Sequence, residues 1–71
     1  MPCLRLYVPT LREAPDGKRI SSVLCREPGV YSAIANCGEK VVEIDFEDDE
    51  VTVGRLVELV RDLGHDVRLA G

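Results

Sequence analysis

The chain has 71 residues, a formal net charge of −4 and three cysteines, and this length predicts one domain, residues 1–71, with a small core. Its basic residues are scattered, which argues against a nucleic-acid partner, because nucleic-acid binding needs a clustered positive face. No segment is apolar for long enough to cross a membrane and no signal-peptide pattern opens the chain, so we expect a soluble, cytoplasmic protein without membrane insertion.

The first strand is predicted at Cys3–Val8, where apolar and charged or polar side chains alternate. Pro9 ends this strand because proline has no N–H to donate to a ladder. A loop follows as far as Asp16, which we expect to be the N-cap of a helix that ends at Pro28-Gly29. Ser21 is expected to face water. The apolar face of this helix consists of Ile20, Val23 and Leu24.

The second and third strands are predicted at Val30–Cys37 and Val42–Phe46, joined by the turn residues Gly38–Lys40. The third strand has the clearest pattern in the chain, because its apolar side chains alternate strictly with Glu43 and Asp45. We therefore expect the third strand to lie in the centre of a sheet.

A run of four acidic residues, Glu47–Glu50, precedes the second helix. Such a run is typical of a solvated loop, and a helix N-terminus favours negative charge. Thr52 is predicted to cap this helix, which ends at Gly64, and Val67–Leu69 is predicted to form a short last strand. The apolar stripe of the helix consists of Val53, Leu56, Val57, Val60 and Leu63.

The element order β-α-β-β-α-β predicts an α+β fold of the ferredoxin-like type. In this layout two right-handed crossovers, with a hairpin between them, form one four-stranded antiparallel sheet that carries both helices on one face. The first and third strands occupy the middle of the sheet, and the second and fourth strands are its edges.

The chain resembles the heavy-metal-associated domains, a family of small copper chaperones, mercury-binding proteins and N-terminal modules of metal-pumping P-type ATPases. The resemblance covers nearly the whole chain and implies a metal-trafficking module with a metal-transporting ATPase or another protein as partner. The residues that carry it are Gly29-Val30, the strand with Val42, Ile44 and Phe46, Val51, and Leu63-Gly64-His65.

The metal-binding motif of this family, Gly-Met-Thr/Ser-Cys-x-x-Cys, falls on the loop after the first strand. Leu11 keeps the apolar position of the motif, but its two cysteines fall on Glu13 and Asp16. Carboxylates do not replace thiolates as ligands of a soft ion, so we do not expect Cu(I) to be the cargo. Glu13, Asp16 and His65 are candidate ligands for a divalent ion, namely Zn(II), Ni(II) or Co(II).

A structural interpretation competes with this metal site. Asp16 would then be a helix cap, Glu13 a solvated loop residue, and His65 a half-exposed residue at a helix end. The three cysteines, Cys3, Cys25 and Cys37, are interpreted as small apolar fillers or ordinary surface thiols.

An enzymatic function is not expected, because no nucleophile has a neighbouring base and no glycine-rich phosphate loop is present. Two alternatives remain: a protein-interaction module that kept the fold and lost the metal, and a small regulatory ligand-binding domain. For the first alternative, Tyr31 and Ile34 on the edge strand are the expected partner-binding residues. Alone, the chain is expected to be a monomer or a weak dimer.

Overall fold

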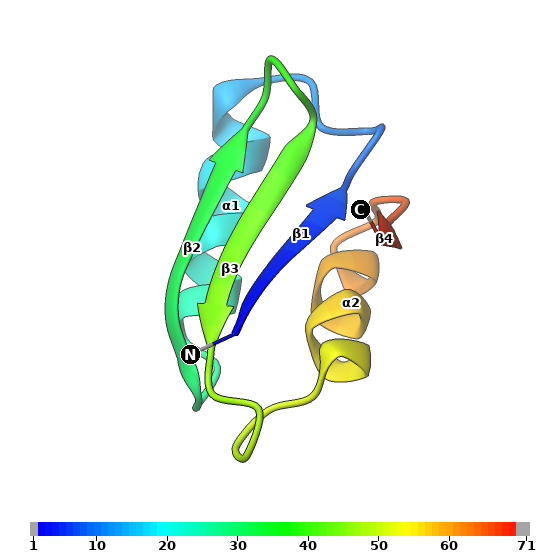
Figure 1. Cartoon of the computed structure of the whole chain (residues 1–71). Helices are drawn as coiled ribbons and strands as arrows, with labels where there is room; N and C mark the ends of the chain where they lie inside the picture. The colour runs from blue at the N-terminus through cyan, green and yellow to red at the C-terminus, as the bar shows by residue number, and fades with distance from the viewer. Residues whose placement is uncertain (1, 70–71) are drawn as a thin grey trace.

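A computed structural model describes residues 2–69 and contains four strands and two helices in the predicted order (Figure 1). The elements, in chain order, are β1 (Cys3–Tyr7), α1 (Ala14–Cys25), β2 (Val30–Asn36), β3 (Val41–Phe46), α2 (Val53–Asp62) and β4 (Arg68–Leu69). Within residues 2–69, no helix is long and apolar enough to cross a membrane.

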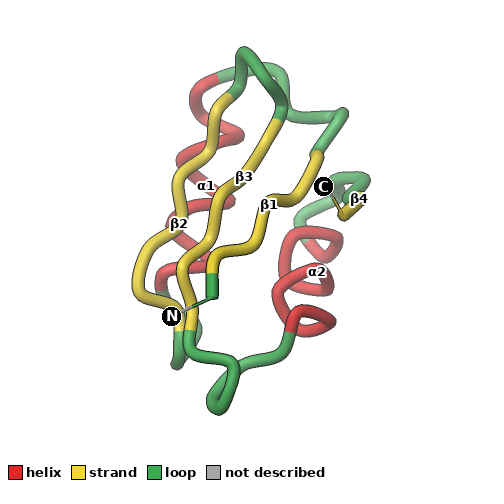
Figure 2. Tube along the Cα trace, in the orientation of Figure 1, coloured by secondary structure: helices red, strands yellow, loops and turns green. Residues whose placement is uncertain are grey.

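The four strands form one antiparallel sheet in the order β2-β3-β1-β4 (Figure 2). β3 pairs with both β1 and β2, with Ile44 opposite Leu4 on one side and Ala33 on the other. β4 adds only two pairs, Leu6 with Leu69 and Tyr7 with Arg68. The ferredoxin-like fold, with the first and third strands in the centre, is therefore confirmed.

The core forms where the inward side chains of the sheet meet both helices. On β1 and β3, Leu6, Val42 and Ile44 are fully buried, and the alternate positions Arg5 and Glu43 are exposed. Burying alternate residues on one face is what fixes the register of a strand, because a slip of one residue would expose every apolar side chain. The helices contribute four fully buried side chains: Ile20, Leu24, Leu56 and Val60.

The two helices begin differently. Thr52 caps α2 as predicted, with its hydroxyl accepting the N–H of Arg55 at 3.1 Å. The predicted cap of α1 is wrong: its N-cap is Glu13, without a side-chain cap bond, and Asp16 lies inside the first turn. Pro15 explains the early start of α1. The fixed φ of proline suits the first turn of a helix, and N–H groups in that turn have no acceptor within the helix, so the missing N–H of proline costs no hydrogen bond.

Gly29 connects α1 to β2 in a backbone conformation that needs glycine. Its φ is +95°, and a Cβ at this position would lie 2.8 Å from the Cβ of Glu50. The backbone of Gly29 also accepts a hydrogen bond from the N–H of Glu47 at 2.7 Å. The acidic loop is thus held against the start of β2.

Candidate functional site

The loop between β1 and α1 is anchored by Leu11, whose side chain is fully buried. The N–H of Leu11 donates to the carbonyl of Val8 at 2.9 Å, which closes a turn. Val8 in turn donates its N–H to the carbonyl of Lys40 at 2.7 Å, so the loop starts beside the β2–β3 turn. Leu11 therefore occupies the buried position that the sequence resemblance gave it.

Lys40 ties the β2–β3 turn to this loop a second time. Its ammonium group donates to the carbonyl of Leu11 at 2.9 Å. Lys40 has a φ of 59°, which is uncommon for a residue with a side chain. Its backbone and its side chain together hold the loop from the side of β3.

Thr10 connects the same loop to the segment after α2. Its Oγ1 lies 2.8 Å from Nδ1 of His65 and accepts the N–H of Asp66 at 3.3 Å. His65 therefore lies at the loop, as the sequence predicted. Its polar partner is the Thr10 hydroxyl.

The two predicted carboxylate ligands lie at the start of α1. Glu13 is exposed, and Asp16 is half-buried. Within residues 2–69, no group of three or more His, Cys, Asp or Glu side chains is arranged to hold a metal ion. Glu13, Asp16 and His65 therefore share one end of the molecule without converging on a point, and their role as ligands stays a prediction.

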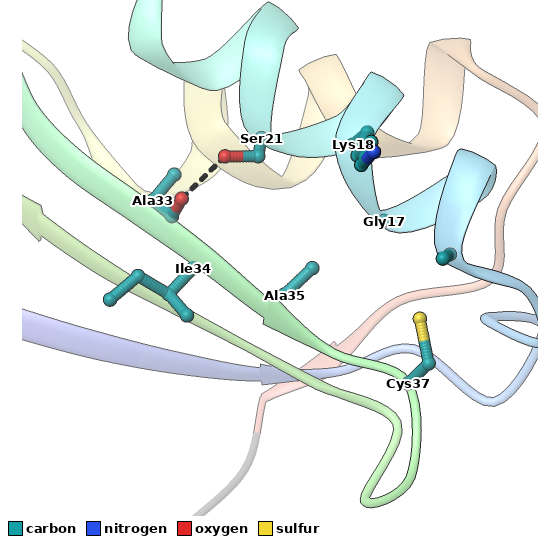
Figure 3. Close-up of a pocket in the computed structure, with 8 residues that line it drawn as sticks. Gly17, Lys18, Ser21, Ala33, Ile34, Ala35 and Cys37 are labelled. Atoms are coloured by element: carbon teal, nitrogen blue, oxygen red, sulfur yellow. Dashed lines mark hydrogen bonds between the residues drawn. The ribbon is translucent and has the colours of Figure 1, made fainter.

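Cys37 is a candidate ligand that the sequence analysis treated as a filler or surface thiol. Its thiol donates to the carbonyl of Glu13 at 3.4 Å, and its sulfur points toward the start of α1 (Figure 3). A Cβ built on Gly17 would lie 3.3 Å from that sulfur, so glycine at this position makes room for the thiol. The turn at Gly38–Lys40 is the feature of the sequence that indicates this position, because it places the end of β2, and Cys37 with it, at the loop end of the sheet.

The other two cysteines lie away from the loop. Cys3 is exposed at the start of β1, and a hydrogen bond with the Asp45 carboxylate is the largest cause of its raised pKa, followed by desolvation and the Asp45 charge. Cys25 is exposed in the last turn of α1. The loop therefore has one thiol close to it among the described residues.

The predicted partner-binding residues lie on β2, an edge of the sheet. Tyr31 is 61% exposed and Ile34 is 66% exposed. The Tyr31 hydroxyl donates to Glu47 at 3.3 Å. The negative charge of Glu47 is the largest cause of a raised pKa of Tyr31, because it opposes formation of the phenolate. A partner role for these residues stays a prediction.

No protein-family model matches this chain, and no curated protein matches it. Several solved structures, by contrast, are similar to this chain. The CopZ metallochaperone is 25% identical with a TM-score of 0.91, over 94% of this chain and 100% of that chain. The N-terminal domain of a potential copper-translocating P-type ATPase from Bacillus subtilis, in its Cu(I)-loaded state, is 26% identical with a TM-score of 0.92, over 97% and 86%.

A third structure, a copper-binding domain from the P-type ATPase HMA7, has a TM-score of 0.94 at 17% identity, over 100% of this chain and 96% of that one. At that identity the likeness concerns the fold alone. Together these structures confirm that the chain has the copper-chaperone-like fold of heavy-metal-associated domains, as the resemblance implied.

The expectation of a divalent ion in preference to Cu(I) is wrong. Two of these structures are copper proteins: the HMA7 domain is copper-binding, and the Bacillus subtilis ATPase domain is in its Cu(I)-loaded state. That expectation rested on the motif positions, Glu13 and Asp16, and on the lack of a second cysteine beside Cys37 at the loop. The soft sulfur of Cys37 lies against the loop backbone.

Proposed function

We propose that this chain is a non-catalytic module of metal trafficking and that Cu(I) is the metal it handles. The observation that supports this most directly is the structural likeness to the CopZ metallochaperone and to a Cu(I)-loaded ATPase domain, over more than nine-tenths of the chain. Among the described residues, the buried core is apolar and contains no buried polar or charged side chain.

In this proposal Cys37 supplies one thiolate to Cu(I). Thiolates are the ligands that select Cu(I), and Cys37 is the thiol nearest the loop among the described residues. A single thiolate leaves the coordination incomplete. The missing ligands would come from the cysteines of a partner, so that the metal is held jointly at the moment of transfer.

The partner we propose is a cytoplasmic metal-transporting ATPase domain or chaperone that presents its own thiolates. Glu13 and His65 border the same end of the molecule. The imidazole of His65 is the better candidate for a further ligand, because nitrogen donors suit copper more than carboxylates do. Its Nε2 makes none of the described hydrogen bonds.

Anaerobic titration with Cu(I) in the presence of glutathione tests this function, since glutathione can supply the second thiolate. We expect saturation at one equivalent, with the largest NMR shifts at Cys37, Glu13 and Lys40. Cys37→Ser should abolish competition with a chromophoric Cu(I) chelator. Cys25→Ser is the matched control, because this thiol lies at the opposite end of α1. Binding that is absent, or unchanged by Cys37→Ser, would overturn the proposal.

A protein-interaction function without metal is the second candidate. The exposed, apolar side chains of Tyr31 and Ile34 on the edge strand favour it. A chain that binds its partner with the same affinity in the presence and absence of Cu(I), and also as Cys37→Ser, would support this alternative.

A further inference from the structure

β2 is an edge strand whose side chains offer little protection against pairing, although its register with β3 shifts between Val30 and Ser32. Its seven residues, Val30–Asn36, include no charged residue and no proline. The other strands carry charges at Arg5, Glu43 and Asp45, or Arg68. Natural proteins usually place a charge or proline on an exposed edge, because its free N–H and C=O groups can pair with another chain.

The two ends of this edge differ in charge. At its start, Tyr31 contacts Glu47, and the acidic run continues to Glu50. None of these four carboxylates takes part in a salt bridge among the described residues. The acidic end of the edge therefore has negative charge that is not neutralised within the chain.

A positive charge lies on α1, near the other end of this edge. Lys18 on α1 lines a groove between α1 and β2, whose other lining residues include Ile34 and Ala35 (Figure 3). Its ammonium group makes none of the salt bridges described for residues 2–69. α1 runs antiparallel to β2, since Ser21 donates to the carbonyl of Ala33 and Gly17 lies against Ala35. Lys18 is therefore toward the end of β2 that is remote from Glu47.

We propose that a second copy of this chain pairs with β2 in antiparallel orientation, so that two four-stranded sheets join into one. Pairing centred on Ala33 places this residue on the two-fold axis and Ser32 opposite Ile34 of the second copy, in the part of β2 that follows its register shift. Antiparallel pairing brings the acidic end of each copy to the Lys18 end of the other. The opposite charges therefore meet twice across one interface.

Side chains on the open face of the sheet extend the contact. Ile34 points away from α1, whereas Ala35 points toward it (Figure 3). Ile34 would lie opposite Ser32 of the second copy and diagonal to its Ile34, within reach of an apolar contact. Ala33 lies at the centre, and its carbonyl accepts one hydrogen bond from Ser21. A carbonyl has two lone pairs, so one remains for the second copy.

This interface does not depend on the proposed metal, and sedimentation equilibrium of the full chain under reducing conditions tests it. We expect a monomer–dimer equilibrium and, by hydrogen exchange, protection of the Tyr31–Ala35 amides that increases with protein concentration. Ile34→Lys should weaken dimerisation by about tenfold, because two like charges would lie beside the axis. Residue 34 lies opposite Glu43 on β3. A lysine at position 34 would face this carboxylate, so the variant should still fold.

Two further variants make the result specific. Leu69→Lys is the matched control, because Leu69 is 67% exposed but lies on the opposite edge of the sheet. Lys18→Glu should weaken the dimer, and the double variant Lys18→Glu/Glu47→Lys should restore it. The proposal is overturned if the protein stays monomeric at millimolar concentration, if Leu69→Lys weakens association as much as Ile34→Lys, or if the charge exchange fails to restore it.

Discussion

Thr10 and His65 are 55 positions apart in the sequence, yet Oγ1 of Thr10 lies 2.8 Å from Nδ1 of His65. The same hydroxyl accepts the N–H of Asp66. We expect Thr10→Val, which keeps the shape and removes the hydroxyl, to lower the free energy of unfolding by about 1 kcal/mol. Thr10→Ser keeps the hydroxyl and should therefore retain most of the wild-type stability. Urea denaturation of both variants measures this; equal losses would mean that the hydroxyl is not the stabilising group.

Leu11 tests whether the loop depends on its buried side chain. Leu11→Ala should cost about 2–5 kcal/mol in the free energy of unfolding, because a fully buried leucine is replaced by a cavity. Leu11→Met, which introduces the residue typical of the family motif, should cost less than about 1.5 kcal/mol, since the volume is nearly conserved. Chemical denaturation compares the two, and a small cost for Leu11→Ala would contradict the buried placement.

Alanine substitutions at two glycines distinguish the cost of backbone strain from the cost of steric overlap. Gly29 and Gly64 have φ values of +95° and +92°, so alanine at either position should be destabilising by about 1–2 kcal/mol. A Cβ on Gly64 meets nothing within 4 Å, whereas a Cβ on Gly29 would lie 2.8 Å from the Cβ of Glu50. Gly29→Ala should therefore lower the thermal midpoint more than Gly64→Ala. The reverse order would show that the acidic loop moves aside.

Cys3 should react slowly with alkylating reagents. Its pKa is raised, first by the hydrogen bond with Asp45, and the thiolate is the reactive form. Between pH 7 and 9, Cys3 should therefore be modified more slowly than an unperturbed exposed thiol, and Asp45→Asn should accelerate it. Mass spectrometry after timed iodoacetamide treatment follows each site. If the alkylation rate of Cys3 is unchanged in Asp45→Asn, Asp45 is not the cause of the slow reaction.

The sheet and its order could be predicted because local patterns decide them. Val42, Ile44 and Phe46 alternate with polar residues, and this fixes both the strand and its buried face. The start of α1 could not be predicted as reliably. Asp16 is a good capping residue, but Pro15 also fits the first turn, and the choice of Glu13 as cap depends on where the loop is anchored.

The contacts around the loop could not be predicted from sequence patterns, because they join segments that are far apart in the sequence. Nothing near Lys40 in the sequence indicates that its ammonium group binds the carbonyl of Leu11. Ser21, expected in water, donates to Ala33 on β2. Cys37 could be placed at the correct end of the sheet, but its contact with Glu13 required the packing of α1 against β2. For this reason the sequence did not reveal a thiol beside the loop, and Cu(I) was not expected.

The hydrogen bonds that Thr10, Lys40 and Cys37 make have a thermodynamic consequence for recognition. They order the β1–α1 loop while the chain folds, when each backbone residue loses about 1–2 kcal/mol of conformational freedom. A molecule that arrives at this loop then encounters a preorganised surface, and little further entropy is lost on contact. Association should therefore be governed by diffusion and charge, with a small heat-capacity change, rather than by rearrangement of the loop.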